Sequence, residues 1–501
     1  MLFSRRMVDA YCWPQSIPSD GAHTLVDIHV SSSRWDCIVS VTRSQTQKEV
    51  YRSFPLHCKL HPTPDEAYSF GCGWPSVLSI DVKAWESDLY IVKVMTNERY
   101  PIETLAYFVV TPAEGKKSPI LLVLSTTTWN AYNDWGGRCL YTGATRVSFE
   151  RPLANGFLHK TPSQNRKKTQ PIPGDKEALY YTEWAKEHHL SVWSGSSGWW
   201  NWERLMYEWL IDNDYKVDVA TSVDLHANPH LLSGHKVFLS VGHDEYWSAA
   251  MRDHVEAFRA SGGHVCILSG NTCFWQVRME NNNREMVCYK YTPEKDPVLG
   301  TSEQRSLATQ WVDRRVHRPE QSTIGLSFSR GGYSRYGNGV PRASGGYTIY
   351  RSEHWVFAGT NLCYGDVIGL NDCIVAYETD GCEFTMTYGV PEPTFNDGAP
   401  RGLTILAMAP ARLWSQYEQP SRYSEEPGEL EAIAMAIHGE HWKQHAHKYA
   451  NNHCVIAIVD ATESEGILFN VGVTDWAYAL EGRDSDVETI TKNVLNRMLR
   501  K

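Results

Sequence analysis

The sequence predicts an α/β protein in which a β-sandwich precedes a larger, doubly wound α/β domain. Three observations lead to this fold class. The chain has 501 residues, more than one hydrophobic core of about 250–300 residues holds. Its first part alternates apolar and polar residues in short runs. The remainder alternates continuous apolar runs with segments of helical period, so we expect two domains, at residues 1–115 and 116–501.

The N-terminal domain is predicted from about residue 20 to residue 113. Short runs with period-2 alternation include TLVDIHVSSS, DCIVSVTRS and LYIVKVMTN, and clusters of turn residues separate them. Short strands at this spacing are typical of an immunoglobulin-like β-sandwich. PAEGKKSP, at 112–119, is the predicted linker.

The second domain is predicted to contain a parallel sheet. The apolar runs at 119–125, 236–242 and 264–270 are typical of strands buried on both faces, and 202–215 has helical period. Strands that alternate with helices favour a doubly wound sheet of the Rossmann-like or glutamine-amidotransferase-like kind. Further strands are predicted at 403–410, 454–460 and 466–472, and a terminal helix at 484–501.

Composition argues against several classes of protein. The net charge is -10 and no basic stripe runs through the chain, so we expect no nucleic-acid partner. Arg166, Lys167 and Lys168 form the densest basic cluster, which we interpret as a solvated loop. No stretch approaches 18 apolar residues and the N-terminus lacks the apolar run of a signal peptide, so we expect a cytoplasmic protein without a membrane partner.

Polar and ionisable residues follow three of the predicted strands. Tyr132 and Tyr141 come after the strand at 119–125, and His243, Asp244 and Glu245 come after the strand at 236–242. Asn271 follows the strand at 264–270. Ligands of open α/β sheets bind beyond the carboxyl ends of the strands. The three strand ends therefore predict one shared site.

Each of these residues also has a structural interpretation. Glu245 could cap a helix that begins there, with His243 as a loop residue, and Asn271 could be a turn residue. In the functional interpretation, Glu245 is a carboxylate aimed at a metal and His243 carries a proton beside it. Asn271 would then orient the substrate.

Other kinds of site are less well supported by the sequence. No GxSxG nucleophile elbow and no P-loop are present, and the twelve cysteines form no CxxC pair. His441 and His445 are spaced i, i+4 in a predicted helix and could bind zinc. No Glu follows the first His and polar residues surround the pair, so a solvated helix face is the better interpretation.

Six segments together resemble the C-terminal catalytic region of the N,N-dimethylformamidase large (beta) subunit-like family. They are TTTWNAYNDWGGRCLY, SVGHDEYW, LSGNTCFWQVR, HWVFAGT, AYETDG and FNVGVTDWAYAL. The likeness extends over most of the chain. It implies a mononuclear iron, Fe3+, held by two tyrosinates and one carboxylate.

Carried over by position, the resemblance assigns Tyr132, Tyr141 and Glu245 as the metal ligands. Tyr141 is the less certain of the two tyrosines because the loop lengths differ, and Tyr180, Tyr181 and Tyr246 are the alternatives. A ferric ion prefers anionic oxygen ligands, and three such ligands would neutralise its charge.

The resemblance also assigns catalytic roles to three further residues. His243 matches the His of the GHDEY motif, Asn271 matches the Asn of SGN, and Glu378 matches the acid of AYETD. A metal there would polarise an amide carbonyl and activate water. Glu378 or His243 would move the proton, and Asn271 would hold the carbonyl or the oxyanion.

We therefore expect a metal-dependent hydrolase that cleaves a C–N bond of a small amide or formamide. One alternative is another iron-dependent reaction of a biosynthetic pathway, and a second is a binding or structural protein without catalysis. The predicted partner is a small-molecule amide, and a homo-oligomer remains open. The family enzyme is larger and works with a small subunit, and the segment after Tyr141 differs from the family's version, so the iron site carries over better than the substrate.

Overall fold

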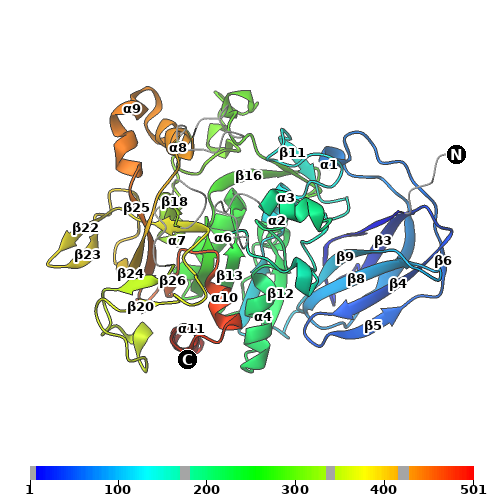
Figure 1. The fold of residues 1–501 in the computed structure, drawn as a ribbon, viewed down its shortest axis with the longest axis horizontal. Coiled ribbons are helices and arrows are strands. Elements are labelled where there is room, and N and C mark those ends of the chain that lie inside the picture. Colours follow the sequence, from blue (N-terminus) through cyan, green and yellow to red (C-terminus); the bar gives the residue numbers. More distant parts are fainter. Residues whose placement is uncertain (1–6, 170–180, 335–344, 416–427, 501) are drawn as a thin grey trace.

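The computed structural model of the chain describes residues 7–169, 181–334, 345–415 and 428–500. Its architecture is mixed α/β, with a β-rich N-terminal part on one side of a larger body of sheet and helices (Figure 1). β9 ends at Thr111 and β10 begins at Ile120. Residues 112–119, the predicted linker, therefore connect these two strands without a helix or strand of their own.

Two antiparallel sheets make up the N-terminal part. The smaller has the order β1-β3-β7, and the larger has the order β2-β9-β8-β4-β5, with β6 also paired to β4. The strands are β1 (Val8–Trp13), β2 (Ser16–Pro18), β3 (Leu25–Ser32), β4 (Asp36–Arg43), β5 (Lys48–Arg52), β6 (Leu56–His57), β7 (Ser76–Asp81), β8 (Asp88–Thr96) and β9 (Glu103–Thr111). Only the edge pair β2–β9 is parallel.

Alternation along these strands builds the core between the sheets. Cys37, Val39 and Val41 of β4 are fully buried, and they belong to one hydrophobic cluster with Val26 and Ile28 of β3. Successive side chains of a strand point to opposite faces, so every second residue reaches this core. The pattern that predicted the strands is the pattern that buries them.

The larger part is built on a nine-stranded sheet of order β12-β10-β13-β15-β26-β25-β24-β19-β20. The strands in chain order are β10 (Ile120–Leu124), β12 (Val217–Thr221), β13 (Val237–His243), β15 (His264–Gly270), β19 (Tyr347–Ile349), β20 (Val367–Ile368), β24 (Thr404–Ala411), β25 (Asn452–Val459) and β26 (Leu468–Asn470). All six strands predicted from apolar runs, at 119–125, 236–242, 264–270, 403–410, 454–460 and 466–472, are present.

The prediction of a parallel sheet holds for one half only. β12, β10, β13, β15 and β26 are parallel, whereas β25, β24, β19 and β20 continue the sheet in antiparallel fashion. A parallel pair needs a crossover of a dozen or more residues, and the connection from β25 to β26 is shorter. α8 (Glu429–His438) and α9 (Trp442–His445), which precede β25, lie past the end of the sheet (Figure 1).

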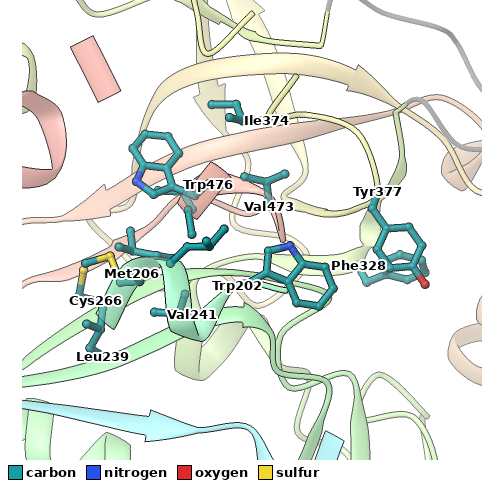
Figure 2. Close-up of a cluster of buried hydrophobic side chains, with 14 of the residues drawn as sticks. Trp202, Met206, Leu239, Val241, Cys266, Phe328, Ile374, Tyr377, Val473 and Trp476 are labelled. Atoms are coloured by element: carbon teal, nitrogen blue, oxygen red, sulfur yellow. The ribbon is translucent and has the colours of Figure 1, made fainter. Parts of the chain in front are cut away.

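Helices cover both faces of the parallel half. One hydrophobic cluster joins Met206 of α4 (Glu203–Asp212) and Trp476 of α10 (Trp476–Glu481) to Leu239 of β13. A second cluster joins Met251 of α6 (Ala249–Ala260) to Phe238, the next residue of the same strand. Figure 2 shows part of the first cluster, where Trp202, Met206 and Val241 lie close together. The terminal helix α11 (Ser485–Leu499) belongs to the same cluster.

The remaining elements are short. They are α1 (Ala67–Phe70), α2 (Thr126–Tyr132), α3 (Tyr181–Glu187), α5 (Ser222–Ala227), α7 (Gln321–Ile324), α8 (Glu429–His438), α9 (Trp442–His445), β11 (Arg146–Ser148), β14 (Tyr246–Ser248), β16 (Trp275–Glu280), β17 (Glu285–Val287), β18 (Ser327–Tyr333), β21 (Glu378–Gly381), β22 (Phe384–Thr387) and β23 (Val390–Pro393). Across the described residues, none of the helices combines the length and apolar character that crossing a membrane requires.

Candidate functional site

The parallel half of the sheet brings the predicted strand ends together. β10 leads directly into α2, which ends at Tyr132. β13 ends at His243 and β15 at Gly270, and these two residues are paired across the strands. Asn271 follows with φ at +48°, a left-handed conformation that Asn tolerates. The three strand ends that were predicted to share a site therefore lie at the same edge of the sheet.

Three acidic side chains meet at this edge. The Tyr132 hydroxyl oxygen lies 2.8 Å from Glu245 Oε2, and the Tyr141 hydroxyl oxygen lies 2.9 Å from the same atom. The two phenol oxygens are 2.5 Å apart, and their rings stack at 4.3 Å between centroids. Two phenols and a carboxylate thus form a compact group of oxygen donors.

Glu245 is held from two sides. The indole Nε1 of Trp275 donates to Glu245 Oε1 at 2.7 Å, and the backbone N–H of Glu245 donates to Thr128 Oγ1 at 2.9 Å. The structure rules out the interpretation of Glu245 as a helix cap. The chain first forms the short strand β14, and α6 begins at Ala249 with Ser248 as its N-cap.

The other candidate tyrosines lie differently. The Tyr246 hydroxyl donates to the Tyr141 hydroxyl at 2.8 Å and, among the described residues, forms no hydrogen bond with Glu245. The hydroxyl of Tyr181 bonds Ser194 Oγ at 3.1 Å instead, and Tyr180 lies outside the described residues. Tyr141 is thus the tyrosine that accompanies Tyr132 and Glu245.

His243, Glu378 and Asn271 form a second group beside the first. His243 Nε2 lies 2.5 Å from Glu378 Oε2 and 3.4 Å from Glu245 Oε2. Its Nδ1 is fixed by the backbone carbonyl of Ser196 at 2.7 Å. Asn271 Nδ2 donates to Glu378 Oε2 at 3.1 Å, and Asn271 Oδ1 is buried without a partner among the described residues.

The pKa values of this second group are those of a buried ion pair. Burial by itself raises the pKa of Glu378, but the neighbouring charge of His243 outweighs it and lowers the pKa to about 2. Burial by itself lowers the pKa of His243, and the charge of Glu378 raises it to about 9. At neutral pH the carboxylate is therefore ionised and the imidazole protonated.

Lys290 is a site residue that sequence reasoning missed. Its ammonium donates to the Tyr246 hydroxyl at 2.8 Å and lies 3.2 Å from the centroid of the Tyr141 ring. Burial lowers the pKa of Lys290 to about 8. Lys290 does not follow a predicted strand and belongs to no recognised motif. Its sequence context therefore gave no indication that it lies at the site.

The basic cluster at 166–168 is a second correction. Its interpretation as a solvated loop is wrong for the side chains, although the backbone is a loop. Lys168 Nζ donates to Ser196 Oγ at 2.6 Å and to the Tyr377 hydroxyl at 2.9 Å. Lys167 Nζ lies 3.7 Å from the ring centroid of Tyr478. Aromatic faces and hydroxyls thus take up the charges that water was expected to solvate.

Both groups line a cavity of about 480 Å³. Tyr132, Tyr141 and Glu245 form one part of its wall, and Asn271 and Glu378 form another. Pockets of this size with apolar walls and a few convergent polar groups are typical of small-molecule sites. The arrangement can bind a ligand, hold a cation and move a proton.

The alternative site around His441 and His445 is not assembled. The predicted helix is broken, since His441 ends a short 3₁₀ segment and α9 begins after it. His445 stacks on His438, at 4.1 Å between ring centroids, and His441 is exposed. No group of three or more His, Cys, Asp and Glu in the described part of the chain is placed to hold a metal.

The donor set at Tyr132, Tyr141 and Glu245 nevertheless fits a hard metal ion. All three donor atoms are oxygens, which hard metal ions prefer. Two of them belong to tyrosines, so this group is not one of three His, Cys, Asp or Glu residues. Burial and the charge of Glu245 raise the pKa of both tyrosines well above the usual range. A cation bound by these three groups would stabilise both phenolates.

Comparison with known families agrees with this geometry. The family model described as N,N-dimethylformamidase beta subunit-like, C-terminal, matches residues 27–490. The chain belongs to this family. The dimethylformamidase-like match includes every residue of the two groups described above, and it extends from the N-terminal sheets to the terminal helix.

Individual relatives are more distant. The N,N-dimethylformamidase beta subunit of Alcaligenes sp is 27% identical over 223 residues, which are 42% of this chain and 28% of that protein. The chain thus matches less than a third of that relative's length. The crystal structure of CopC from Methylosinus trichosporium OB3b aligns with 20% of this chain and 86% of its own at 17% identity, with a TM-score of 0.14, too low to support an argument.

Proposed function

We propose that this dimethylformamidase-like chain is an iron-dependent hydrolase that cleaves the C–N bond of an amide. The observation that carries the proposal is the meeting of Tyr132, Tyr141 and Glu245, whose oxygens lie 2.5–3.0 Å from one another in a cavity. These three groups can all be ionised at neutral pH only if a cation stabilises the two phenolates beside the carboxylate. The name of the Alcaligenes relative supports the amide substrate class.

Tyr132, Tyr141 and Glu245 would hold the metal. A ferric ion bound there would supply Lewis acidity, which polarises an amide carbonyl and acidifies water. The Trp275 indole fixes the orientation of the Glu245 carboxylate through its hydrogen bond to Oε1. Lys290 places a positive charge against the face of the Tyr141 ring, which favours the ionised phenol.

His243 and Glu378 would move the proton. Hydrolysis of an amide needs a base that takes a proton from water and an acid that gives one to the leaving amine. Glu378 is the ionised member of the pair and acts as the base, and protonated His243 acts as the acid. Glu378 Oε2 and His243 Nε2 are 2.5 Å apart. After His243 has given its proton to the leaving amine, Glu378 can therefore pass on to His243 the proton that it took from water.

Asn271 would orient the substrate. One N–H of its amide is committed to Glu378, and an amide nitrogen carries a second N–H that can reach a carbonyl or an oxyanion. Donors placed where charge develops contribute a large share of catalysis in acyl transfer. The left-handed backbone at Asn271 aims this side chain into the cavity that it lines.

We also propose the finer fold classes and the division of the chain. The two packed antiparallel sheets support an immunoglobulin-like sandwich for residues 1–115. The parallel half-sheet with helices on both faces supports a Rossmann-like domain for residues 116–501. The relative is called one subunit of its enzyme, which supports an assembly of several chains here.

The test is a visible absorption spectrum of the purified protein, with metal analysis of the same sample and a panel of small amides. A charge-transfer band, about one iron per chain and release of amine from an amide would support the proposal. Iron with the band but without release of amine would favour the non-hydrolytic alternative. A colourless protein without metal would favour a binding or structural role.

A further inference from the structure

A third carboxyl group faces the cavity, and the proposed reaction does not use it. Glu429, in the first turn of α8, lines the same space as Glu245 and Glu378. Its Oε1 accepts a hydrogen bond from the Tyr333 hydroxyl at 2.7 Å. Within the part of the chain that the structure describes, its other oxygen, Oε2, is buried without a hydrogen-bond partner. A buried acceptor without a partner carries a free-energy cost that a ligand donor would remove.

The position of Glu429 relative to the proposed reaction centre is defined by Tyr333. The same Tyr333 hydroxyl that bonds Glu429 lies 3.4 Å from Glu378 Oε1. Glu429 is therefore separated from the proton-transfer pair by one side chain, that of Tyr333. A substrate whose amide lies at Asn271 and Glu378 would extend toward Glu429.

Much of the cavity wall is aromatic. Its rings include those of the following residues: Trp193, Trp275, Phe328, Tyr333, Tyr377 and Trp414. Tyr333 and Trp414 stack at 5.0 Å between centroids beside Glu429. Aromatic faces attract ammonium groups as well as apolar ones, and a carboxylate next to such faces is the arrangement that recognises a cationic amine.

The cavity is large for a simple dialkylformamide. Dimethylformamide has five non-hydrogen atoms and, at ~30 Å³ for each water-sized atom, would occupy roughly 150 Å³. The cavity holds about 480 Å³. The remaining space extends to Glu429, where a longer substrate would place its far end.

We propose that the substrate is an aromatic or similarly extended amide that carries an amino group, and that Glu429 binds this amino group as its ammonium. The inference rests on the proposed function for the position of the amide. The unpaired oxygen and the aromatic wall belong to Glu429's end of the cavity. Burial raises the pKa of the unliganded Glu429 to about 8, and an ammonium group bound beside it would lower that pKa and favour the carboxylate. An anionic substituent is disfavoured because the ionised Glu378 faces the same cavity.

Lys168 and Lys290, which line the cavity, and the neighbouring His243 already have partners, and the third lysine of the wall, Lys295, is exposed to solvent. Lys290 donates to the Tyr246 hydroxyl and lies over the Tyr141 and Trp275 rings, at 3.2 and 4.7 Å from their centroids. Lys168 donates to two hydroxyls. His243 contacts Glu378. Glu429 is thus the carboxyl group whose second oxygen is left for a ligand.

The experiment compares the binding of benzylamine and benzyl alcohol to the metal-loaded protein at pH 7 by calorimetry. The two probes have the same size, and only the amine is charged. We expect benzylamine to bind at least 10-fold more tightly than the alcohol. In Glu429→Gln this preference should fall below twofold, and in the control Glu440→Gln, which removes an exposed acid outside the cavity, it should persist.

Equal binding of both probes by the wild-type protein would overturn the inference without reference to any variant. A preference that persists in Glu429→Gln, with unchanged circular dichroism, would overturn it as well. Amide turnover is measured on the same samples. Turnover without an amine preference refutes this inference alone, whereas an amine preference without turnover of any amide refutes the proposed function alone.

Discussion

The phenol oxygens of Tyr132 and Tyr141 lie 2.5 Å apart, and the Glu245 carboxylate contacts both. Burial raises the pKa of each phenol, so both remain protonated unless a cation stabilises their ionised forms. Metal binding at this group would therefore release protons. Because the three side chains are in contact, we expect the loss of any one of them to lower the metal content of the protein.

Removal of either phenol oxygen is expected to abolish metal binding. Tyr132→Phe and Tyr141→Phe keep the rings and their stacking but remove one ligand each, so the visible band should disappear and the iron content should fall below a tenth of wild type. Plasma mass spectrometry and absorption spectra of the purified variants measure this.

Tyr107→Phe is the matched control for the tyrosine variants. Tyr107 is buried, and its hydroxyl bonds Gln15 at 3.0 Å, away from the cavity. This variant should keep its iron. One iron per chain in both Tyr132→Phe and Tyr141→Phe would refute the ligand assignment.

Glu378→Gln is expected to lower activity and leave the metal in place. Glu378 contacts His243, Asn271 and Tyr333, whereas the phenol oxygens contact Glu245. Loss of a general base typically costs about 10²–10⁴-fold in kcat. Steady-state kinetics and iron analysis of the same sample test this, with the exposed Glu392→Gln as control. Loss of iron together with activity would assign Glu378 to the metal instead.

Asp88→Ala is expected to destabilise the contact between the N-terminal sheets and the rest of the chain. Asp88 of β8 is fully buried and accepts from Arg43 Nε and from the Tyr207 hydroxyl of α4, each at 2.8 Å. Loss of one member of a buried pair costs about 3–5 kcal/mol. Chemical unfolding should show this loss, and Arg52→Ala, at an exposed pair, should leave the midpoint nearly unchanged. Equal midpoints for the two variants would contradict the role of Asp88.

Glu203 gives an expected pH dependence of stability. Burial raises its pKa to about 8, and Glu203 Oε1 accepts from the Ser125 N–H and the Trp129 indole. Between its ordinary pKa of about 4.3 and about 8, the unfolded chain releases this proton and the folded chain keeps it. The contribution to stability is therefore complete below pH 4.3 and is lost as the pH rises to about 8.

Thermal unfolding at pH 5 and pH 8 measures this effect. Glu203→Gln keeps the acceptor oxygen and cannot ionise, so its unfolding temperature should fall less between the two pH values than that of wild type. Glu208→Gln, at an exposed position of the same helix, should behave as wild type. Parallel pH profiles for wild type and Glu203→Gln would show that Glu203 does not titrate as a buried acid.

Local patterns predicted much of the site. Runs of apolar residues placed the ends of β10, β13 and β15, and the residues after them, Tyr132, His243 and Asn271, do converge. Glu378 does not follow a strand of this sheet. It begins β21, which pairs with β18 of a separate two-stranded sheet, so only the family resemblance pointed to it.

The sequence by itself determined the alternation of sheet and helix, the linker at 112–119 and the strand ends that carry the proposed ligands, because hydrophobic period and strand length are local properties. Tertiary structure alone decided the antiparallel half of the sheet, the choice of Tyr141 over Tyr246, and the positions of Lys290 and Glu429 in the cavity. These depend on which distant segments pack against each other. That packing depends on how much apolar surface the whole chain buries. It therefore produces no periodic pattern of apolar residues within any one segment.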